Sequence, residues 1–405
     1  MERLAFRILL GLAIGACLAA VFGAHAMEAR WIIEPIGAIF LRLLLSLVLP
    51  LAVSALVLAV ADLQPGALVG TGGRLLGLTL GLTSVAVGIG VALVQIIRPG
   101  EGIDRATLPA GGVVTAATPD AVQSIIELFP SNPFKAAADG NMVPVLVFAV
   151  VAGLALRQTN TEPSRRLQEV IQGVFDVCAL GVQMVMRLGP VGVGAMAYMA
   201  VAKGGLAALL PVANFAAVAA LALGLQTFVV YPVALRVLGH TSPVAFFRAV
   251  RPALAVAFAT ASSAATLPTT LRVADEGLRI PDDTARFVLT VGASANQNGT
   301  ALYEGVAILF ICQLYGVDLS FGQQLVVVGV SVLAGVGTAG VPAASIPVIA
   351  AVVGAFGVPP EAVGVLVGVD RVLDMCRTTV NVAGDLVIAR IVGGERGVLE
   401  TGRAL

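Results

Sequence analysis

Long apolar stretches alternate with short charged clusters along most of the chain. A helix needs about 20 apolar residues to cross the hydrocarbon core of a bilayer. Stretches of this kind lie near residues 5–24, 36–62, 73–97, 142–158, 170–202 and 207–237. This pattern predicts an all-α polytopic protein of the cell (inner) membrane, in contact with lipid.

The composition agrees with this class. Of 405 residues, 58% are hydrophobic and only 12% are charged, against about 25% charged residues in soluble domains. The 24 basic and 24 acidic residues balance, so no basic surplus indicates a nucleic-acid partner. Four cysteines lack the spacing of a disulfide framework or a zinc site, and we interpret them as small buried apolar residues.

The first stretch follows Arg3 and Arg7 and could imitate a signal peptide. Because the rest of the chain is just as apolar, we interpret it as a retained first span. Residues 98–140 are rich in Pro, Gly and Asp and predict a long loop with short helical pieces. If the amino terminus lies inside, the arginine-bearing segments 157–166 and 236–251 also lie inside, as the positive-inside rule favours.

The carboxyl-terminal part has apolar stretches that small polar residues and prolines interrupt. Residues around 258–270 include ATASSAATLPTT, and residues around 331–347 read SVLAGVGTAGVPAASIP. The apolar arms on either side are too short to cross a bilayer alone, so we predict two re-entrant hairpins. Two interrupted segments of this kind point to a transporter's binding site. Two ordinary helices kinked by proline are the alternative.

The final apolar span, VDRVLDMCRTTVNVAGDLVIA, concentrates its polar side chains on one face. At about 100° per residue the face is about 100° wide, and it carries Asp370, Asp374, Arg377, Thr378, Asn381 and Asp385. A charge at the centre of a membrane costs about 2.5–3.5 kcal/mol, so this face must line protein or water. Asp374 and Arg377 could simply neutralise each other. One arginine cannot serve three carboxylates, however, so Asp385 would need a sodium ion or a proton.

A polar, glycine-containing break interrupts the apolar segment before the second predicted hairpin. It reads VGASANQNGTALYEG, and unwound backbone there would free carbonyl oxygens for a hard cation. Glu304 follows in the same span. Desolvation favours the protonated form of a lone buried carboxyl, so Glu304 is a candidate proton carrier. A position at a helix end near the lipid headgroups is the alternative.

Four ordered motifs, SSAATLP, NQNGTALYEG, GTAGVPAAS and DMCRTTVNVAGD, resemble the glutamate transporter family of dicarboxylate/amino acid:cation symporters. The resemblance covers essentially the whole chain. It implies eight transmembrane helices plus two re-entrant helical hairpins, inverted repeats, and an elevator-type homotrimer. In this division scaffold helices 1 and 2 fall in 1–70, helix 3 of the transport domain in 71–100, and a loop with scaffold helices 4 and 5 in 101–204. The rest of the transport domain is 205–405, with hairpin 1 at 243–279, helix 7 at 284–314, hairpin 2 at 323–357 and helix 8 at 360–393.

The resemblance also assigns a substrate site by position. Asp374, assisted by Thr378, corresponds to the residue that binds the substrate amino group. Arg377 corresponds to the residue that binds the side-chain carboxylate, which a guanidinium can hold through two parallel hydrogen bonds. Asn381 corresponds to the ligand of the α-carboxylate, and the pocket is completed by Ser263, Thr300, Gly340 and Val341. Dicarboxylate carriers of the family lack the aspartate and neutral amino-acid carriers lack the arginine, so the chain's substrate is implied to be aspartate or glutamate.

The sodium sites of the family are only partly matched. One implied ligand set is complete, with Gly292, Asn296, Asn381 and Asp385, and another consists of Ser294 with the backbone of Gly335, Val336 and Thr338. The third set departs from the family, because Asn298 stands where the family has an aspartate and Leu82 stands where the family has a threonine, although Thr83 remains. We expect this third site to be lost. Gln297 replaces a methionine that links sodium binding to gate closure.

Glu304 stands where proton-coupled relatives carry their proton. Ala261 and Met375 both lack an arginine that many relatives have at one or other position, and the role of Arg371 is left open. The favoured function is symport of acidic amino acids with protons and without a cofactor. The alternatives are sodium symport through the two remaining sites and, in a different class, an anion channel. An intramembrane hydrolase is disfavoured because no histidine or lysine base accompanies Ser262 or Ser263.

Overall fold

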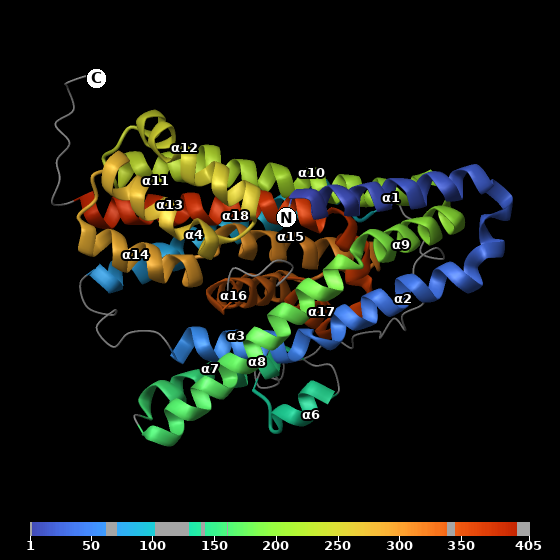
Figure 1. The fold of residues 1–405 in the computed structure, drawn as a ribbon, viewed down its shortest axis with the longest axis horizontal. Coiled ribbons are helices and arrows are strands. Elements are labelled where there is room, and N and C mark those ends of the chain that lie inside the picture. Colours follow the sequence, from blue (N-terminus) through green and yellow to red (C-terminus); the bar gives the residue numbers. More distant parts are fainter. Residues whose placement is uncertain are drawn as a thin grey trace.

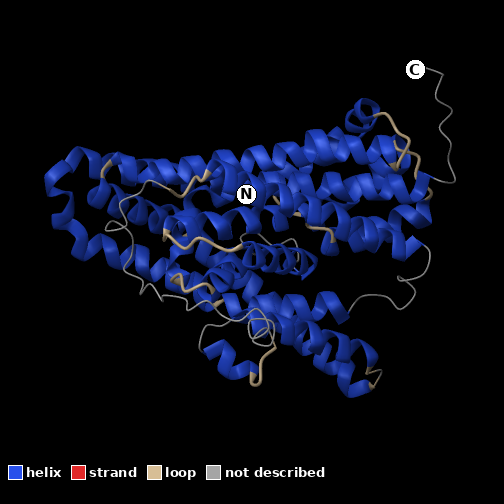
Figure 2. Ribbon diagram, turned by 180° about the vertical axis from the view of Figure 1, so that it is seen from behind, coloured by secondary structure: helices blue, strands red, loops and turns tan. Residues whose placement is uncertain are grey.

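The structure, a computed structural model, describes residues 2–61, 71–101, 129–138, 142–159, 161–337 and 345–394. Every regular element in these ranges is a helix (Figure 1), and the view from behind is equally helical (Figure 2). The predicted all-α class is therefore confirmed. The helices are α1 (Glu2–Phe22), η1 (Gly23–Ala29), α2 (Arg30–Ser46), α3 (Val48–Ala61), α4 (Thr71–Ile97), α6 (Pro133–Ala138), α7 (Met142–Gln158), α8 (Glu162–Arg187), α9 (Gly189–Gly204), η4 (Leu206–Leu209), α10 (Leu210–Leu225), η5 (Gln226–Val230), α11 (Tyr231–Val237), α12 (Pro243–Thr260), α13 (Ser263–Arg272), η6 (Val273–Gly277), α14 (Asp282–Ala295), α15 (Asn298–Leu314), α16 (Phe321–Gly337), α17 (Ser345–Ala355), η7 (Pro360–Val363) and α18 (Gly364–Gly393).

Several helical stretches are long and apolar enough to cross a membrane. Among the described residues there are five, at His25–Leu58, Gly72–Ile97, Glu162–Arg187, Leu210–Val237 and Pro243–Thr260. They support an integral membrane protein. The number of spans, the re-entrant hairpins, the division into two domains and the homotrimer stay predictions.

Two predicted spans, 36–62 and 170–202, each prove to be two consecutive helices, which corrects their boundaries. The breaks precede Pro50 in the first turn of α3 and Pro190 in the first turn of α9. Proline lacks an N–H and clashes with the preceding turn, so it fits best in the first turn of a helix and kinks or breaks a helix when it lies in the interior. Each interruption is a single residue, Leu47 or Leu188, which keeps dihedral angles in the right-handed helical region.

The first predicted hairpin, 243–279, corresponds mainly to α12 and α13, which pack against each other across a two-residue break. Ala261 ends α12 in the left-handed region with φ +48°, and the Ser262 hydroxyl caps α13 by accepting a hydrogen bond from the Ala265 N–H at 3.2 Å. The arm α12 has 18 residues and is long enough to cross a membrane alone, so the predicted shortness of this arm was wrong. The tip of the second hairpin, residues 338–344, lies outside the described residues.

Helix α15 forms the centre of the molecule. All of its 17 residues are buried. The helices that pack around it are α4, α10, α16, α17 and α18. Figure 1 shows α15 beside α18, with α3, α7 and α8 on one outer side. A helix that is apolar on all sides is typical of such a central position. The few polar residues of α15 therefore have only protein around them.

Helices α1 and α9 approach each other unusually closely through glycines. A Cβ atom added at Gly15 would lie 2.0 Å from the carbonyl oxygen of Gly194, and one added at Gly11 would lie 2.1 Å from that of Pro190. Small residues at such crossings let two backbones come into van der Waals contact, which drives helix association in membranes. The glycines are therefore required by packing.

This packing predicts that Gly15→Ala destabilises the folded protein by about 1–3 kcal/mol, the usual cost of overpacking. The matched control is Gly77→Ala in α4, where an added Cβ meets nothing within 4 Å in the described structure. Alanine favours helix formation over glycine, so the control should be neutral or stabilising. Melting temperatures in detergent compare the two, and equal values would contradict the packing argument.

Candidate functional site

The site begins at the break between α14 and α15. Asn296 (φ −110°, ψ 77°) and Gln297 (φ −105°, ψ 54°) leave the helical conformation, so the predicted break is confirmed. The side chain of Asn381 on α18 closes it, because its Oδ1 accepts hydrogen bonds from the N–H groups of Gly299 (2.7 Å) and Thr300 (3.3 Å). An amide thus caps the start of α15 from a different helix, in the manner of an N-cap residue.

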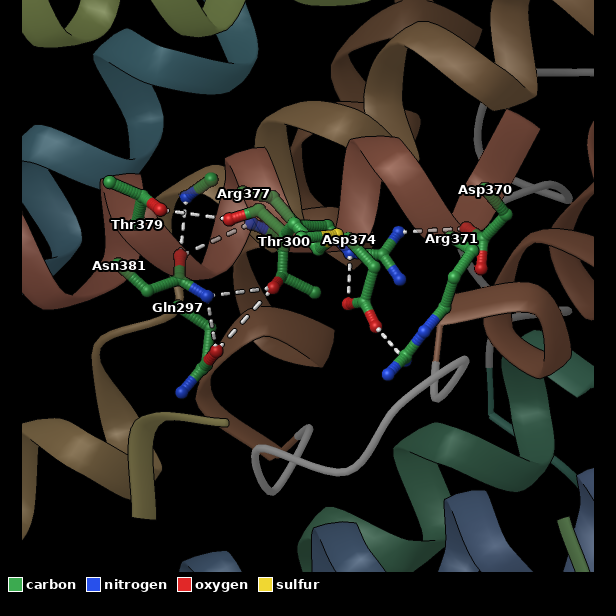
Figure 3. Close-up of polar contacts among 10 residues, drawn as sticks. Gln297, Thr300, Asp370, Arg371, Asp374, Arg377, Thr379 and Asn381 are labelled. Atoms are coloured by element: carbon green, nitrogen blue, oxygen red, sulfur yellow. Dashed lines mark hydrogen bonds and ion pairs between the residues drawn. The ribbon is translucent and has the colours of Figure 1, made fainter. Parts of the chain in front are cut away.

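The other end of the Asn381 amide binds side chains at the same break. Its Nδ2 donates to Gln297 Oε1 at 2.5 Å and to Thr300 Oγ1 at 3.0 Å. Gln297 in turn donates from Nε2 to the Ala293 carbonyl at 3.0 Å. Figure 3 shows Asn381, Gln297 and Thr300 converging. The predicted residues Asn381 and Thr300 therefore lie together, and Gln297 ties them to α14.

A cluster of four charged side chains lies next along α18 (Figure 3). Arg377 donates from Nε to Asp374 Oδ1 at 2.9 Å and from Nη1 to Asp370 Oδ1 at 3.1 Å. Arg371 donates from Nη1 to Asp374 Oδ2 at 3.0 Å. All four are at most 5% exposed. Internal pairing of Asp374 with Arg377, left open by the sequence, is what the molecule without a ligand displays.

Sequence reasoning overlooked Arg371 as a member of this cluster. It counted one arginine for three carboxylates, whereas two arginines serve Asp370 and Asp374. The signal was present, because Arg371 and Asp374 are three residues apart and such residues are neighbours on a helix. Arg377 has a further partner, since its Cζ lies 4.4 Å from the ring centroid of Tyr303 on α15. A guanidinium over an aromatic face is a favourable cation–π arrangement.

Glu304 lies in the second turn of α15 and is completely buried. Its placement excludes the alternative of a helix end near headgroups. The Ser345 hydroxyl lies beside this carboxyl group, but neither carboxyl oxygen makes a hydrogen bond of good geometry with a residue that the structure describes, and the same holds for the buried hydroxyl of Ser331. Ionising such a carboxyl is strongly unfavourable unless a counter-ion or hydrogen bonds compensate, so the surroundings favour the neutral acid.

Asp385 lies on α18 beyond Asn381, beside the same break. Asn296 donates from Nδ2 to its Oδ1 at 2.8 Å, and a Cβ added at Gly292 would lie 2.7 Å from that oxygen. Three of the predicted ligands, Gly292, Asn296 and Asp385, are therefore close together. Asn296 Oδ1 has no partner in the described structure, and it is an oxygen of the kind that hard cations bind.

A neutral network surrounds Asn298, the first residue of α15 after the break. Thr83 on α4 donates to Asn298 Oδ1 at 2.5 Å, Asn298 donates from Nδ2 to the hydroxyl of Tyr231 at 3.2 Å, and Tyr231 donates to the Val380 carbonyl at 3.0 Å. Leu82, which directly precedes Thr83 in the sequence, is also buried. The Asn298 side chain therefore has both its ends occupied by protein groups. Tyr231 is a further residue that sequence reasoning did not identify.

The remaining predicted residues are only partly described. Ser263 begins α13 and is buried, with no partner for its hydroxyl among the described residues. Thr378 is buried on α18, and Gly335 is buried near the end of α16. For Ser294 in α14 and Val336 in α16 the structure describes the backbone alone, and Thr338, Gly340 and Val341 lie outside the described residues.

The buried charges and the broken helix are typical of a membrane transport protein. Comparison with known proteins points to the same class. A sequence model of the Sodium:dicarboxylate symporter family matches residues 4–394, so the chain belongs to this family, and the predicted family membership is confirmed. The Proton/glutamate-aspartate symporter of Escherichia coli (strain K12) is 32% identical over 96% of this chain and 92% of its own length. The Proton/sodium-glutamate symport protein of Bacillus caldotenax is 31% identical over 97% and 94%, and Excitatory amino acid transporter 3 of Oryctolagus cuniculus is 29% identical over 93% and 82%.

The network around Asn298 predicts that Tyr231→Phe destabilises the protein by about 1–3 kcal/mol, because a buried amide donor loses its acceptor. Tyr198→Phe is the matched control: Tyr198 is equally buried, but its hydroxyl donates only to the Ala26 carbonyl at 2.9 Å. Thermal unfolding in detergent should show the larger loss for Tyr231→Phe. A loss no greater than that of the control would mean that the network is unimportant for stability.

Proposed function

We propose that the chain is a secondary active symporter of acidic amino acids, L-aspartate or L-glutamate, in the cell (inner) membrane. The observation that carries this proposal is the buried pairing of Arg377 with Asp374 on one face of α18. Burying a charged side chain inside a membrane protein is unfavourable. Arg377 can bind a carboxylate of an amino acid, and Asp374 can bind its ammonium group. The names of the similar proteins, which mention glutamate or aspartate, support the same substrate class.

In the proposed complex the substrate amino group binds Asp374, with help from Thr378, and the side-chain carboxylate binds Arg377. The α-carboxylate binds the Nδ2 group of Asn381, which must then release one of its present partners, Gln297 or Thr300. Ser263 and the tip of the second hairpin, including Gly340 and Val341, complete the pocket. Arg377 would hold the side-chain carboxylate through two parallel hydrogen bonds, as is usual for a guanidinium and a carboxylate.

We propose protons as the coupling ion, carried by Glu304. Its complete burial without a hydrogen bond of good geometry to a described residue favours the neutral acid, and the occupied Asn298 side chain leaves little reason for a cation there. The alternative is sodium coupling, with one ion at Gly292, Asn296, Asn381 and Asp385 and another at Ser294, Gly335, Val336 and Thr338. The proximity of Asp385, Asn296 and Gly292 supports the first of these sodium sites.

The proposed mechanism is an elevator movement within a homotrimer. The transport domain would contain α4 and the helices from α10 to α18, and the scaffold would contain α1 to α3 and α7 to α9. The contacts among α4, α10, α15 and α18, and separately between α1 and α9 and between α3 and α7, support this grouping. The second hairpin, formed by α16, α17 and the segment between them, would be the gate.

Arg377→Ala is expected to abolish measurable binding of L-aspartate, because the substrate loses its main cationic partner. Isothermal titration calorimetry on the purified protein measures this, and size-exclusion chromatography checks that the variant is folded. Thr379→Val on the same helix is the control, since the Thr379 hydroxyl bonds only to the Met375 carbonyl of its own helix, at 2.8 Å. Unchanged aspartate affinity in the Arg377 variant would refute the assigned site.

A proton gradient alone should drive accumulation of labelled L-aspartate into proteoliposomes, and Glu304→Gln should remove this dependence while exchange of aspartate across the membrane persists. The amide has the shape of the neutral acid but cannot release a proton. A sodium gradient alone is the parallel experiment. Accumulation driven only by sodium, or pH-driven uptake that survives in the variant, would assign the coupling to other groups.

A further inference from the structure

Asp374 is held at both of its oxygens by two different arginines. Arg377 occupies Oδ1 at 2.9 Å and Arg371 occupies Oδ2 at 3.0 Å. The side chains of Arg371 and Asp374 are 4% and 7% exposed, so solvent contributes little to their pairing. Figure 3 shows the Arg371 side chain reaching across to this carboxylate. The group proposed to bind a substrate ammonium therefore has two cationic partners in this structure.

An incoming ammonium would meet two guanidinium groups already bonded to this carboxylate, and the repulsion between like charges a few ångströms apart favours the release of one of them. Arg377 has two further partners, because Nη1 binds Asp370 at 3.1 Å and its plane lies over the ring of Tyr303 at 4.4 Å. Arg371 is held by one hydrogen bond, and its Nε has no partner among the described residues. Arg371 is therefore the guanidinium that an incoming ammonium displaces at the lower cost.

The released guanidinium stays in a buried place, where a charge without a partner is strongly unfavourable. Asp370 has one oxygen, Oδ2, without a partner among the described residues, but Asp370 is adjacent to Arg371 in the helix, and adjacent helical residues do not face each other. The substrate supplies the missing group, since an acidic amino acid brings two carboxylates together with its ammonium. In the proposed complex the α-carboxylate goes to Asn381, so the side-chain carboxylate, which asparagine lacks, is the group that Arg377 and the released Arg371 would share.

We propose that Arg371 is a specificity-determining residue, which neutralises Asp374 in the empty site and exchanges that partner for a substrate carboxylate when the substrate ammonium arrives. This inference rests on the proposed function. The proposal also relates the net charge of the cluster to the charge of the substrate. Two arginines and two aspartates are neutral when empty, so an acidic amino acid adds one negative charge, which a single co-transported proton or sodium ion would compensate. A neutral amino acid would add none.

Replacing Arg371 with glutamine leaves the empty cluster with one negative charge and should shift its preference away from anionic ligands. The Kd of L-aspartate is expected to rise at least about tenfold, as expected for loss of a unit charge a few ångströms away, while the Kd of L-asparagine does not rise. The ratio of the two constants therefore changes at least about tenfold in favour of asparagine. Arg371→Lys keeps the charge and should keep the aspartate preference, which a merely structural defect would not explain.

Calorimetric titration of wild type, Arg371→Gln and Arg371→Lys with both amino acids tests the inference. If wild type binds aspartate and Arg371→Gln keeps the wild-type ratio, Arg371 has no role in specificity and the inference is wrong. If wild type binds no acidic amino acid, the proposed function itself is wrong. If the glutamine variant does not fold, the aspartate-bound structure of wild type decides: Arg371 still bonded to Asp374 overturns the exchange, and Arg371 on a substrate carboxylate supports it.

Discussion

Polar groups inside this molecule must find their partners within the protein, and the carboxyl-terminal half is built around that requirement. Helix α18 places two arginines and two aspartates on one face, where they form a closed set of ion pairs. Burying such charges in a low-dielectric interior is tolerable only when each has a partner. The completely buried helix α15 packs against this face of α18, and the ring of its Tyr303 lies under the guanidinium of Arg377.

The break between α14 and α15 is the second consequence of the same requirement. Ending a helix in an apolar interior leaves N–H groups without partners, which is costly. Asn381 removes that cost at Gly299 and Thr300, and it lies only four residues after Arg377. The backbone break and the charged cluster are therefore linked through one turn of α18, so a ligand that moves Asn381 or Arg377 acts on both.

The fold class, the broken helix and the polar face of α18 could be predicted from the sequence, because each depends on local composition or on helical spacing. The division of 36–62 and 170–202 into two helices depended on where Pro50 and Pro190 fall within a turn, which apolar length does not reveal. Partners from distant segments were beyond reach: nothing in the sequence places Thr83, Tyr231 and Asn298 in one network. Arg371 was within reach, since its spacing from Asp374 is local.

The two asparagines of the α14–α15 break have different partners, and this difference bears on how a cation could be used. Asn296 is the one amide donor to Asp385 among the described residues, and its own oxygen lacks a partner in the described structure. Asn298 is neutral and bonded at both ends. A neutral amide that is already saturated offers a cation no net attraction, whereas an under-coordinated carboxylate does. A metal ion bound at this break would therefore be better accommodated beside Asp385 than at Asn298, and the proposed proton role of Glu304 requires neither group.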